Sequence, residues 1–141
     1  MKLRYLAAVP CTLVLAACST GCGADQSADL AGRSLMWADG ITADCEVPPT
    51  IKFGADGKVS GNAGCNYLVG SWSMEGAKID LSGLGSTRRM CGPAIMKMED
   101  AFLQNLGKTV YATAEGDKVH FLDADHKLVM TLVPEAPGSC K

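Results

Sequence analysis

The stretch SGNAGCNYLVGSW, residues 60–72, concentrates residue types that often do chemistry in proteins. Its chemically notable members are Gly61, Gly64, Gly70, Cys65 and Asn66. A phosphate-binding loop directs backbone N–H groups toward the ligand ahead of a helix, usually with a Lys followed by Ser or Thr. No Lys follows these glycines, and a strand-like run comes next. The stretch therefore does not predict a phosphate site.

A nucleophilic role for Cys65 would require a histidine that acts as general base. The chain contains only His120, in an alternating run, and His126, in an expected turn. Either could approach Cys65 in the fold, but no spacing in the sequence links them. The Gly-x-Ser-x-Gly elbow of many hydrolases is also absent from the sequence. We expect no catalytic residues and no enzyme activity.

The sequence does not indicate a metal site either. Zinc sites favour ligands paired as Cys-x₂₋₄-Cys, and Cys45, Cys65, Cys91 and Cys140 are all farther apart than that. The segment DADH, residues 123–126, lacks the glycine and the final glutamate of a calcium loop. We expect a hairpin turn with solvated charges there, and neither a metal nor a cofactor.

The N-terminus has the layout of a secretory signal peptide over residues 1–17. Lys2 and Arg4 precede an apolar run, and the small residues of LAAC end that run at Cys18. The run is shorter than the roughly 20 apolar residues that span a bilayer. LAAC resembles the lipobox of bacterial lipoproteins, whose cysteine is acylated and becomes the mature N-terminus. We therefore expect a lipid anchor at Cys18.

This leader predicts an exported protein attached to the cell envelope. Ser19 replaces the aspartate that marks inner-membrane retention in Gram-negative systems, which favours the periplasmic face of the outer membrane. The chain carries a net charge of −2, which becomes −4 when Lys2 and Arg4 leave with the signal peptide. Because the sequence has no basic stripe, we expect no nucleic-acid partner. A lipid or an envelope protein is compatible with the sequence as a partner. The sequence does not indicate the oligomeric state.

The polar residues 18–29 are expected to form a flexible tether, with Cys22 as an odd thiol. One domain then covers residues 30–134, and residues 135–141 form a tail. Within the domain, short apolar or alternating runs are separated by turn signals, the strongest of which is Asp56-Gly57. The expected extended segments are 34–38, 50–54, 58–61, 66–74, 78–84, 86–91, 109–114, 118–123 and 127–134.

Residues 93–107 change to a helical period. Ile95, Met98, Phe102 and Leu106 recur every three or four residues, with Pro93 suited to the first turn and Gly107 to the C-terminal cap. One amphipathic helix can bury its apolar face only against a sheet. The predicted fold class is α+β, mostly β: an antiparallel meander curved into an open barrel around this helix.

GNAGCNYLVGSW followed by LGSTRRMC resembles the META-domain, or HslJ-like, family of small envelope proteins. The matching motif residues are Gly64, Cys65, Asn66, Gly70, Thr87 and Cys91. Trp37, the hairpin IKFGADGKVSG and the C-terminal HFLDADHKLVMTLV also fit, so the resemblance covers about residues 30–133. Met90 departs from the family pattern by one place. In an extended segment Thr87, Arg89 and Cys91 share one side and Met90 faces the other.

The resemblance implies an antiparallel sheet that wraps a helix, and no defined catalytic reaction. Four domain cysteines allow three pairings, and loop length does not choose among them. The placement of Cys65 and Cys91 in the two family motifs implies a disulfide between them, with Cys45–Cys140 as the second pair. Family members are linked to heat inducibility, novobiocin resistance and, in parasites, virulence or motility.

Three functions are compatible with these features. The first is a non-catalytic envelope lipoprotein that acts in envelope stress or in antibiotic or heat tolerance. The second is a binding module whose barrel mouth takes a lipid or another hydrophobic ligand. The third is a periplasmic inhibitor of enzymes. The sequence leaves the choice among them open.

Overall fold

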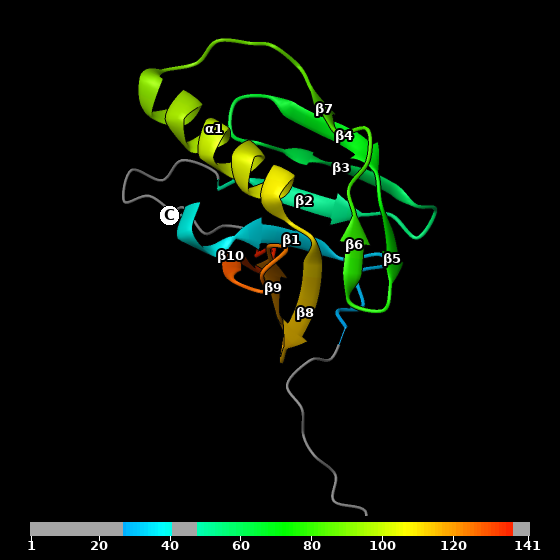
Figure 1. Ribbon diagram of the computed structural model, residues 1–141. Helices are drawn as coiled ribbons and strands as arrows, with labels where there is room; N and C mark the ends of the chain where they lie inside the picture. Colours follow the sequence, from blue (N-terminus) through cyan, green and yellow to red (C-terminus); the bar gives the residue numbers. More distant parts are fainter. Residues whose placement is uncertain (1–26, 41–47, 137–141) are drawn as a thin grey trace, which may run out of the picture.

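The computed structural model describes residues 27–40 and 48–136. The predicted signal peptide, the anchor Cys18, the tether thiol Cys22 and the pair Cys45–Cys140 lie outside the described residues. The described part of the chain forms a curled half-barrel sheet with one α-helix packed across it (Figure 1). The predicted fold class is therefore confirmed.

Within residues 27–40 and 48–136, ten strands form a single sheet, and every pair of neighbours is antiparallel. The strands are β1 (Ser34–Trp37), β2 (Thr50–Phe53), β3 (Lys58–Asn62), β4 (Tyr67–Ser71), β5 (Ser73–Glu75), β6 (Lys78–Asp80), β7 (Gly85–Ser86), β8 (Tyr111–Glu115), β9 (Lys118–Leu122) and β10 (Leu128–Pro134). Their spatial order is β5-β6-β8-β9-β10-β1-β2-β3-β4-β7. A short 3₁₀ turn, η1 (Ala38–Gly40), follows β1.

The chain itself joins the two ends of this sheet. Only Trp72 separates β4, near one end, from β5 at the other end. The backbone N–H of Trp72 donates to the Gly57 carbonyl at 2.9 Å, and its indole N–H donates to the Gly54 carbonyl at 2.9 Å. The predicted single run 66–74 is thus two strands, because the chain changes sheet partners at Trp72, whose backbone and side chain both bind the turn between β2 and β3.

Alternating side chains place the core on the concave side of the sheet. Its largest fully buried side chains include Phe53, Phe102 and Phe121, and Phe53 meets Phe121 edge to face at 6.3 Å between ring centroids. The Asp56-Gly57 turn joins β2 to β3 as predicted. Gly57 has a φ of +82°, a conformation that glycine adopts without steric cost.

The helix α1 (Pro93–Lys108) lies across the concave face and buries Glu99, Phe102 and Leu106. Pro93 occupies the first turn as predicted, where the missing N–H costs nothing. The expected C-cap at Gly107 is wrong, because the helix includes that residue. Thr109 ends it in an extended conformation, with its N–H donating to the Leu106 carbonyl at 3.2 Å.

Two other boundaries differ from the sequence prediction. Of the predicted extended segment 86–91 only Ser86 lies in a strand, β7. Thr87 still donates its N–H to the Tyr67 carbonyl of β4 at 3.1 Å, whereas the Arg89 N–H donates to the Asn66 side chain, so the strand does not continue. The tether was predicted to reach residue 29, but Ser27 bridges Thr113, and the buried Ala28 donates its N–H to the Ala112 carbonyl at 3.2 Å. The ordered domain therefore includes these residues.

No helix in the described part of the chain is both long enough and apolar enough to cross a bilayer.

The close approach of β3 to β2 yields a prediction about Gly61. A Cβ atom at Gly61 would collide with the Thr50 carbonyl oxygen and lie 3.0 Å from the Ile51 Cα atom, whereas one at Gly85 meets nothing within 4 Å. We expect Gly61→Ala to lower the free energy of unfolding by about 1–3 kcal/mol through overpacking. Gly85→Ala, the matched control, should stay within about 0.5 kcal/mol. Urea unfolding measures both; equal effects would contradict the close approach.

Candidate functional site

A buried glutamate on α1 binds the glycine–cysteine loop. Glu99 is only 3% exposed, and its Oε2 atom accepts the backbone N–H of Cys65 at 2.9 Å and that of Asn66 at 2.8 Å. Two successive N–H groups that converge on one oxygen form an anion-binding nest. The loop therefore does bind an acidic group, and that group belongs to the protein itself.

Local geometry directs the loop toward the helix. Gly64 has a φ of +133°, and a Cβ atom there would lie 3.4 Å from the Glu99 Cβ. The Asn62 side-chain oxygen accepts the Gly64 N–H at 2.9 Å and fixes the turn that precedes Cys65. A glycine at position 64 thus meets both a backbone requirement and a close approach to α1.

Asn66 links the loop, the helix and the segment before the helix. Its side-chain nitrogen donates to Glu99 Oε1 at 2.7 Å and to the Arg89 carbonyl at 3.1 Å. Its side-chain oxygen accepts the Thr87 hydroxyl at 3.0 Å and the Arg89 N–H at 2.6 Å. An amide offers two donors and two acceptor positions, and all four are used. Asn66 is 2% exposed, so replacing it would leave several buried groups unpaired.

Segment 87–91 runs beside this loop, and its side chains point alternately toward the loop and away from it. Thr87 accepts the Tyr67 N–H at 3.0 Å, and the Arg89 guanidinium donates to the Cys65 carbonyl at 3.0 Å. Arg89 also lies over the Tyr67 ring, 5.1 Å from its centroid. Met90 points away and is 87% exposed. Arg89 therefore shares the side of Thr87, which is the alternation expected from the sequence.

A disulfide completes the cluster. Cys65 and Cys91 are bonded to each other, with their Cα atoms 5.9 Å apart and a separation of 26 positions in sequence. This is the pairing that the family resemblance implies. A disulfide that closes a loop of this length stabilises a domain by about 2–4 kcal/mol. Five of the motif residues thus meet in one place: Gly64, Cys65, Asn66, Thr87 and Cys91. We call these five residues with Arg89 and Glu99 the Glu99 cluster.

Gly70, the remaining motif residue, lies away from the Glu99 cluster on β4. Leu84 covers it so closely that a Cβ atom at Gly70 would lie 2.7 Å from the Leu84 Cδ2 atom and 3.1 Å from its Cα atom. Its role is to let the segment between β6 and β7 cross over β4. The family motif therefore serves packing at two places. Five of its residues form the Glu99 cluster, and Gly70 makes room for Leu84 on β4.

Sequence reasoning missed Glu99, the residue on which the cluster converges. A signal was present, because Glu99 lies four residues after Ile95 and three before Phe102, on the apolar face of α1. A charged residue at a core-facing position is uncommon unless it is paired. That pattern indicates a buried acceptor that requires donors from elsewhere in the chain.

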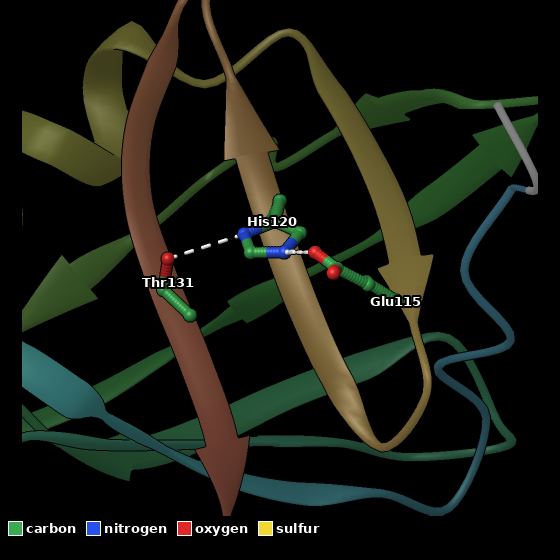
Figure 2. Close-up of polar contacts among 3 residues, drawn as sticks. All are labelled: Glu115, His120 and Thr131. Carbon is green, nitrogen blue, oxygen red and sulfur yellow. Dashed lines mark hydrogen bonds and ion pairs between the residues drawn. The ribbon is translucent and has the colours of Figure 1, made fainter. Parts of the chain in front are cut away.

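The second polar constellation joins three neighbouring strands. Figure 2 shows His120 on β9 between Glu115 on β8 and Thr131 on β10. The His120 Nε2 atom lies 2.8 Å from Glu115 Oε2, and its Nδ1 atom lies 3.1 Å from the Thr131 hydroxyl. A hydroxyl, an imidazole and a carboxylate in this order also occur in nucleophilic enzymes.

The surroundings of His120 favour a structural role for this constellation. Thr131 is its direct cross-strand neighbour on β10, and the Glu115 side chain is 80% exposed. Three hollows in the described part of the chain are lined by other residues. Cross-strand polar pairs of this kind contribute about 0.2–1 kcal/mol. The hydrogen bonds of His120 go to Glu115 and Thr131, and the sulfur of Cys65 is bonded to Cys91.

The segment DADH is a turn, as expected. Asp123 Oδ1 accepts the N–H groups of Asp125 at 2.9 Å and Lys127 at 3.0 Å. His126 stacks on Tyr111 with ring centroids 4.1 Å apart. Among residues 27–40 and 48–136, no group of three or more His, Cys, Asp or Glu side chains is placed to hold a metal ion.

An apolar hollow lies between the two ends of the sheet. It has a volume of about 690 Å³ and is bounded by β6, the segment from Leu81 to Ser86, β4 and the C-terminal half of α1. Its apolar lining consists of Leu68, Ile79, Leu81, Leu84, Leu103, Leu106 and Val110. We call this feature the leucine hollow. Ligand pockets commonly have volumes of about 300–1,000 Å³.

Comparison with known proteins places this fold and cluster in a family. The META domain family model matches residues 30–136, and the chain belongs to that family. No curated protein matches the chain. The family assignment agrees with the resemblance carried by the glycine–cysteine motif.

Two solved structures show the same fold. One is an NMR structure of a protein from Burkholderia xenovorans, 22% identical, with a TM-score of 0.61 over 76% of this chain and 84% of that one. The other is a crystal structure of a DUF4847 family protein from Bacteroides vulgatus, 12% identical, with a TM-score of 0.54 over 74% of this chain and 93% of that one. At these identities the likeness concerns the fold alone.

The arrangement of the Glu99 cluster yields a prediction. In Glu99→Gln, the amide nitrogen must face either the two loop N–H groups or the Asn66 side-chain nitrogen. Because buried donors then lose their acceptor, we expect the free energy of unfolding to fall by about 1–3 kcal/mol. Asp100→Asn, one residue on and exposed, should change it by less than about 0.5 kcal/mol. Equal stability of the two variants in denaturant unfolding would contradict the cluster.

Proposed function

We propose that this protein is a non-catalytic envelope lipoprotein, anchored through Cys18, whose META domain acts in envelope stress or in antibiotic or heat tolerance. The observation that carries the proposal is the Cys65–Cys91 disulfide at the centre of the family motif. Structural disulfides persist in oxidising compartments outside the cytosol. The LAAC sequence that ends at Cys18 is consistent with export and anchoring.

The chemistry of the Glu99 cluster supports a non-catalytic role. The sulfur of Cys65 is bonded in a disulfide, so it is no nucleophile in this state. The N–H groups of Cys65 and Asn66 already bind Glu99 and do not bind an external oxyanion. The residues most suggestive of chemistry in the sequence therefore hold the fold together.

Acylation at Cys18 tests the anchoring directly. We expect mass spectrometry of the mature N-terminal peptide to find lipid on Cys18, and Cys18→Ser to abolish both the modification and the membrane association. Cys22→Ser is the matched control and should keep both. Membrane association of Cys18→Ser equal to that of wild type would contradict the proposal.

A deletion strain tests the role in tolerance. It should become more sensitive to heat or antibiotics, and Cys18→Ser should fail to restore tolerance.

A second function, binding of an apolar ligand, is supported by the leucine hollow. Leu68, Ile79 and Leu106 form a buried floor, whereas Leu81, Leu84 and Leu103 are only partly buried and leave apolar surface facing the hollow. Burial of apolar surface is worth about 25 cal/mol per Å², so an alkyl chain placed there would bind favourably. The anchoring and binding functions are compatible.

Binding of a neutral alkyl compound tests the hollow. We expect the domain to bind dodecyl maltoside below its micelle concentration in native mass spectrometry and calorimetry. Leu103→Glu should weaken binding about fivefold or more, because it puts a charge against the alkyl chain. Leu128→Glu, at a residue 60% exposed on β10 and outside the hollow, should leave binding unchanged. Equal affinities of the two folded variants would contradict this function.

A further inference from the structure

The outer face of β2, β3 and β4, which is turned away from α1, carries a hollow that two lysines line (Figure 1). The hollow has a volume of about 660 Å³, and its lining includes Lys52, Lys58, Ser60 and Val69. All four side chains are exposed and alternate with core residues, as Val59 does with Lys58 and Ser60. The pairing register sets Ser60 between Lys52 on β2 and Val69 on β4. We call this feature the lysine hollow.

The charges that line the lysine hollow favour an anion. Lys52 lies opposite Ser60, so Lys58 is its diagonal neighbour on β3, and such neighbours are about 7–8 Å apart. Asp56 is the one carboxylate in the lining, and its Oδ1 atom accepts the Lys58 N–H at 3.1 Å. The described residues include one ion pair, and neither lysine takes part in it. Two ammonium groups are therefore close enough to contact one anionic group.

Two exposed apolar side chains lie on the same outer face of β4. Tyr67 and Val69 are two residues apart in the strand, and each is more than half exposed. Gly85, opposite Val69 on β7, has no side chain that could cover it. The Arg89 guanidinium lies over the Tyr67 ring, 5.1 Å from its centroid. This face thus combines apolar surface with a third cation.

The other half of the sheet carries the opposite charge. Residues 48–72 and 85–92, which contain β2, β3, β4 and β7, include four cations and one carboxylate. Residues 111–136, which contain β8, β9 and β10, include two lysines and five carboxylates. In the spatial order of the strands, β1 separates the two groups. The domain therefore has a positive side although the chain as a whole is negative.

We propose that the outer face of β2, β3 and β4 docks on an anionic phospholipid bilayer, with lipid phosphates at Lys52 and Lys58. Charge complementarity selects an anionic surface. The exposed Tyr67 selects a bilayer, because its ring is apolar and its hydroxyl is polar, the combination that suits the boundary between head groups and acyl chains. Val69 would lie beside it at that boundary.

This docking goes beyond the anchoring proposed at Cys18 and is compatible with it. Ser27, the first described residue, is nine positions after Cys18. A chain of that length spans at most about 30 Å. An anchored domain would therefore remain within reach of the bilayer surface, and the positive outer face would determine which side it turns toward the lipid.

Vesicle cosedimentation tests the docking on a chain without the anchor. Residues 19–141 lack the proposed lipid anchor and contain every residue that the structure describes. We expect this chain to bind vesicles of equal parts phosphatidylcholine and phosphatidylglycerol about tenfold or more tightly than vesicles of phosphatidylcholine alone, because each basic side chain near an anionic surface contributes about fivefold. The preference should disappear in about 1 M salt, where the screening length falls to about 3 Å.

Two pairs of substitutions locate the docking face. Lys52→Gln with Lys58→Gln should weaken binding to the anionic vesicles about tenfold. Lys118→Gln with Lys127→Gln changes the net charge by the same amount at exposed lysines of the acidic half, and it should weaken binding by less than about twofold. Because all four lysines are exposed, the variants should fold, which thermal unfolding verifies.

A matched pair of substitutions tests the contact of Tyr67 with the bilayer. Tyr67→Thr should weaken binding to the anionic vesicles about threefold, because it removes the apolar surface of the ring. Leu128→Thr, at an exposed residue of β10, should leave binding unchanged. Threonine suits a strand at both positions.

The outcomes separate the docking from the anchoring. Equal binding to the two kinds of vesicle would overturn the docking without bearing on acylation at Cys18, since the tested chain has no anchor. Equal losses in the two lysine pairs would indicate a general effect of net charge and overturn the assignment to this face. A dimer that forms without vesicles and is dispersed by Tyr67→Thr would overturn the docking in favour of contact with a second copy.

Discussion

The structure depends on one buried acceptor, the Glu99 side chain. Its two oxygens receive the N–H groups of Cys65 and Asn66 and the amide of Asn66, and these groups come from a loop that is far from Glu99 in sequence. A buried carboxyl group is costly unless its hydrogen bonds are satisfied. Here satisfying them requires the helix, the loop and the segment before the helix to be in place together.

This requirement explains how a short helix is held against a strongly curved sheet. The apolar residues Phe102 and Leu106 bury one half of α1, while Glu99 and the disulfide hold the other half and the segment before it. The leucine hollow lies at the C-terminal half of α1, away from the hydrogen-bonded cluster. One end of the molecule is thus closed by polar contacts and a covalent bond, and the other leaves apolar surface accessible.

Much of the fold follows from local pattern. The Asp56-Gly57 hairpin, the helix beginning at Pro93 and the three C-terminal strands all obey alternation, helical period and turn chemistry. The alternation of Arg89 and Met90 was also predictable, although that segment forms no strand. What depended on distant partners was missed. Trp72 divides the predicted run 66–74 through its hydrogen bonds to Gly54 and Gly57. The helix end at Thr109 in place of Gly107 is a local difference, since the Thr109 N–H donates to the Leu106 carbonyl.

The candidate site likewise has residues that the sequence indicated and others that only the tertiary fold brings to it. The motif residues and the Cys65–Cys91 pairing followed from the family resemblance, because their spacing is visible in the chain. Glu99 was missed, although its place on the apolar face of α1, four residues after Ile95 and three before Phe102, indicated that it is buried. The N–H groups that it binds belong to the backbone and carry no sequence signal. The leucine hollow is likewise made by the meeting of sheet ends that only the tertiary fold brings together.

Amide hydrogen exchange at Cys65 and Asn66 tests the central claim most directly. Both N–H groups lie in a loop outside the sheet ladder, yet the structure gives each a buried acceptor on Glu99. We predict protection close to that of the core amides of β2 and β9, for which we expect exchange by global unfolding. Exchange of these two amides as fast as that of the exposed Met90 would contradict the account.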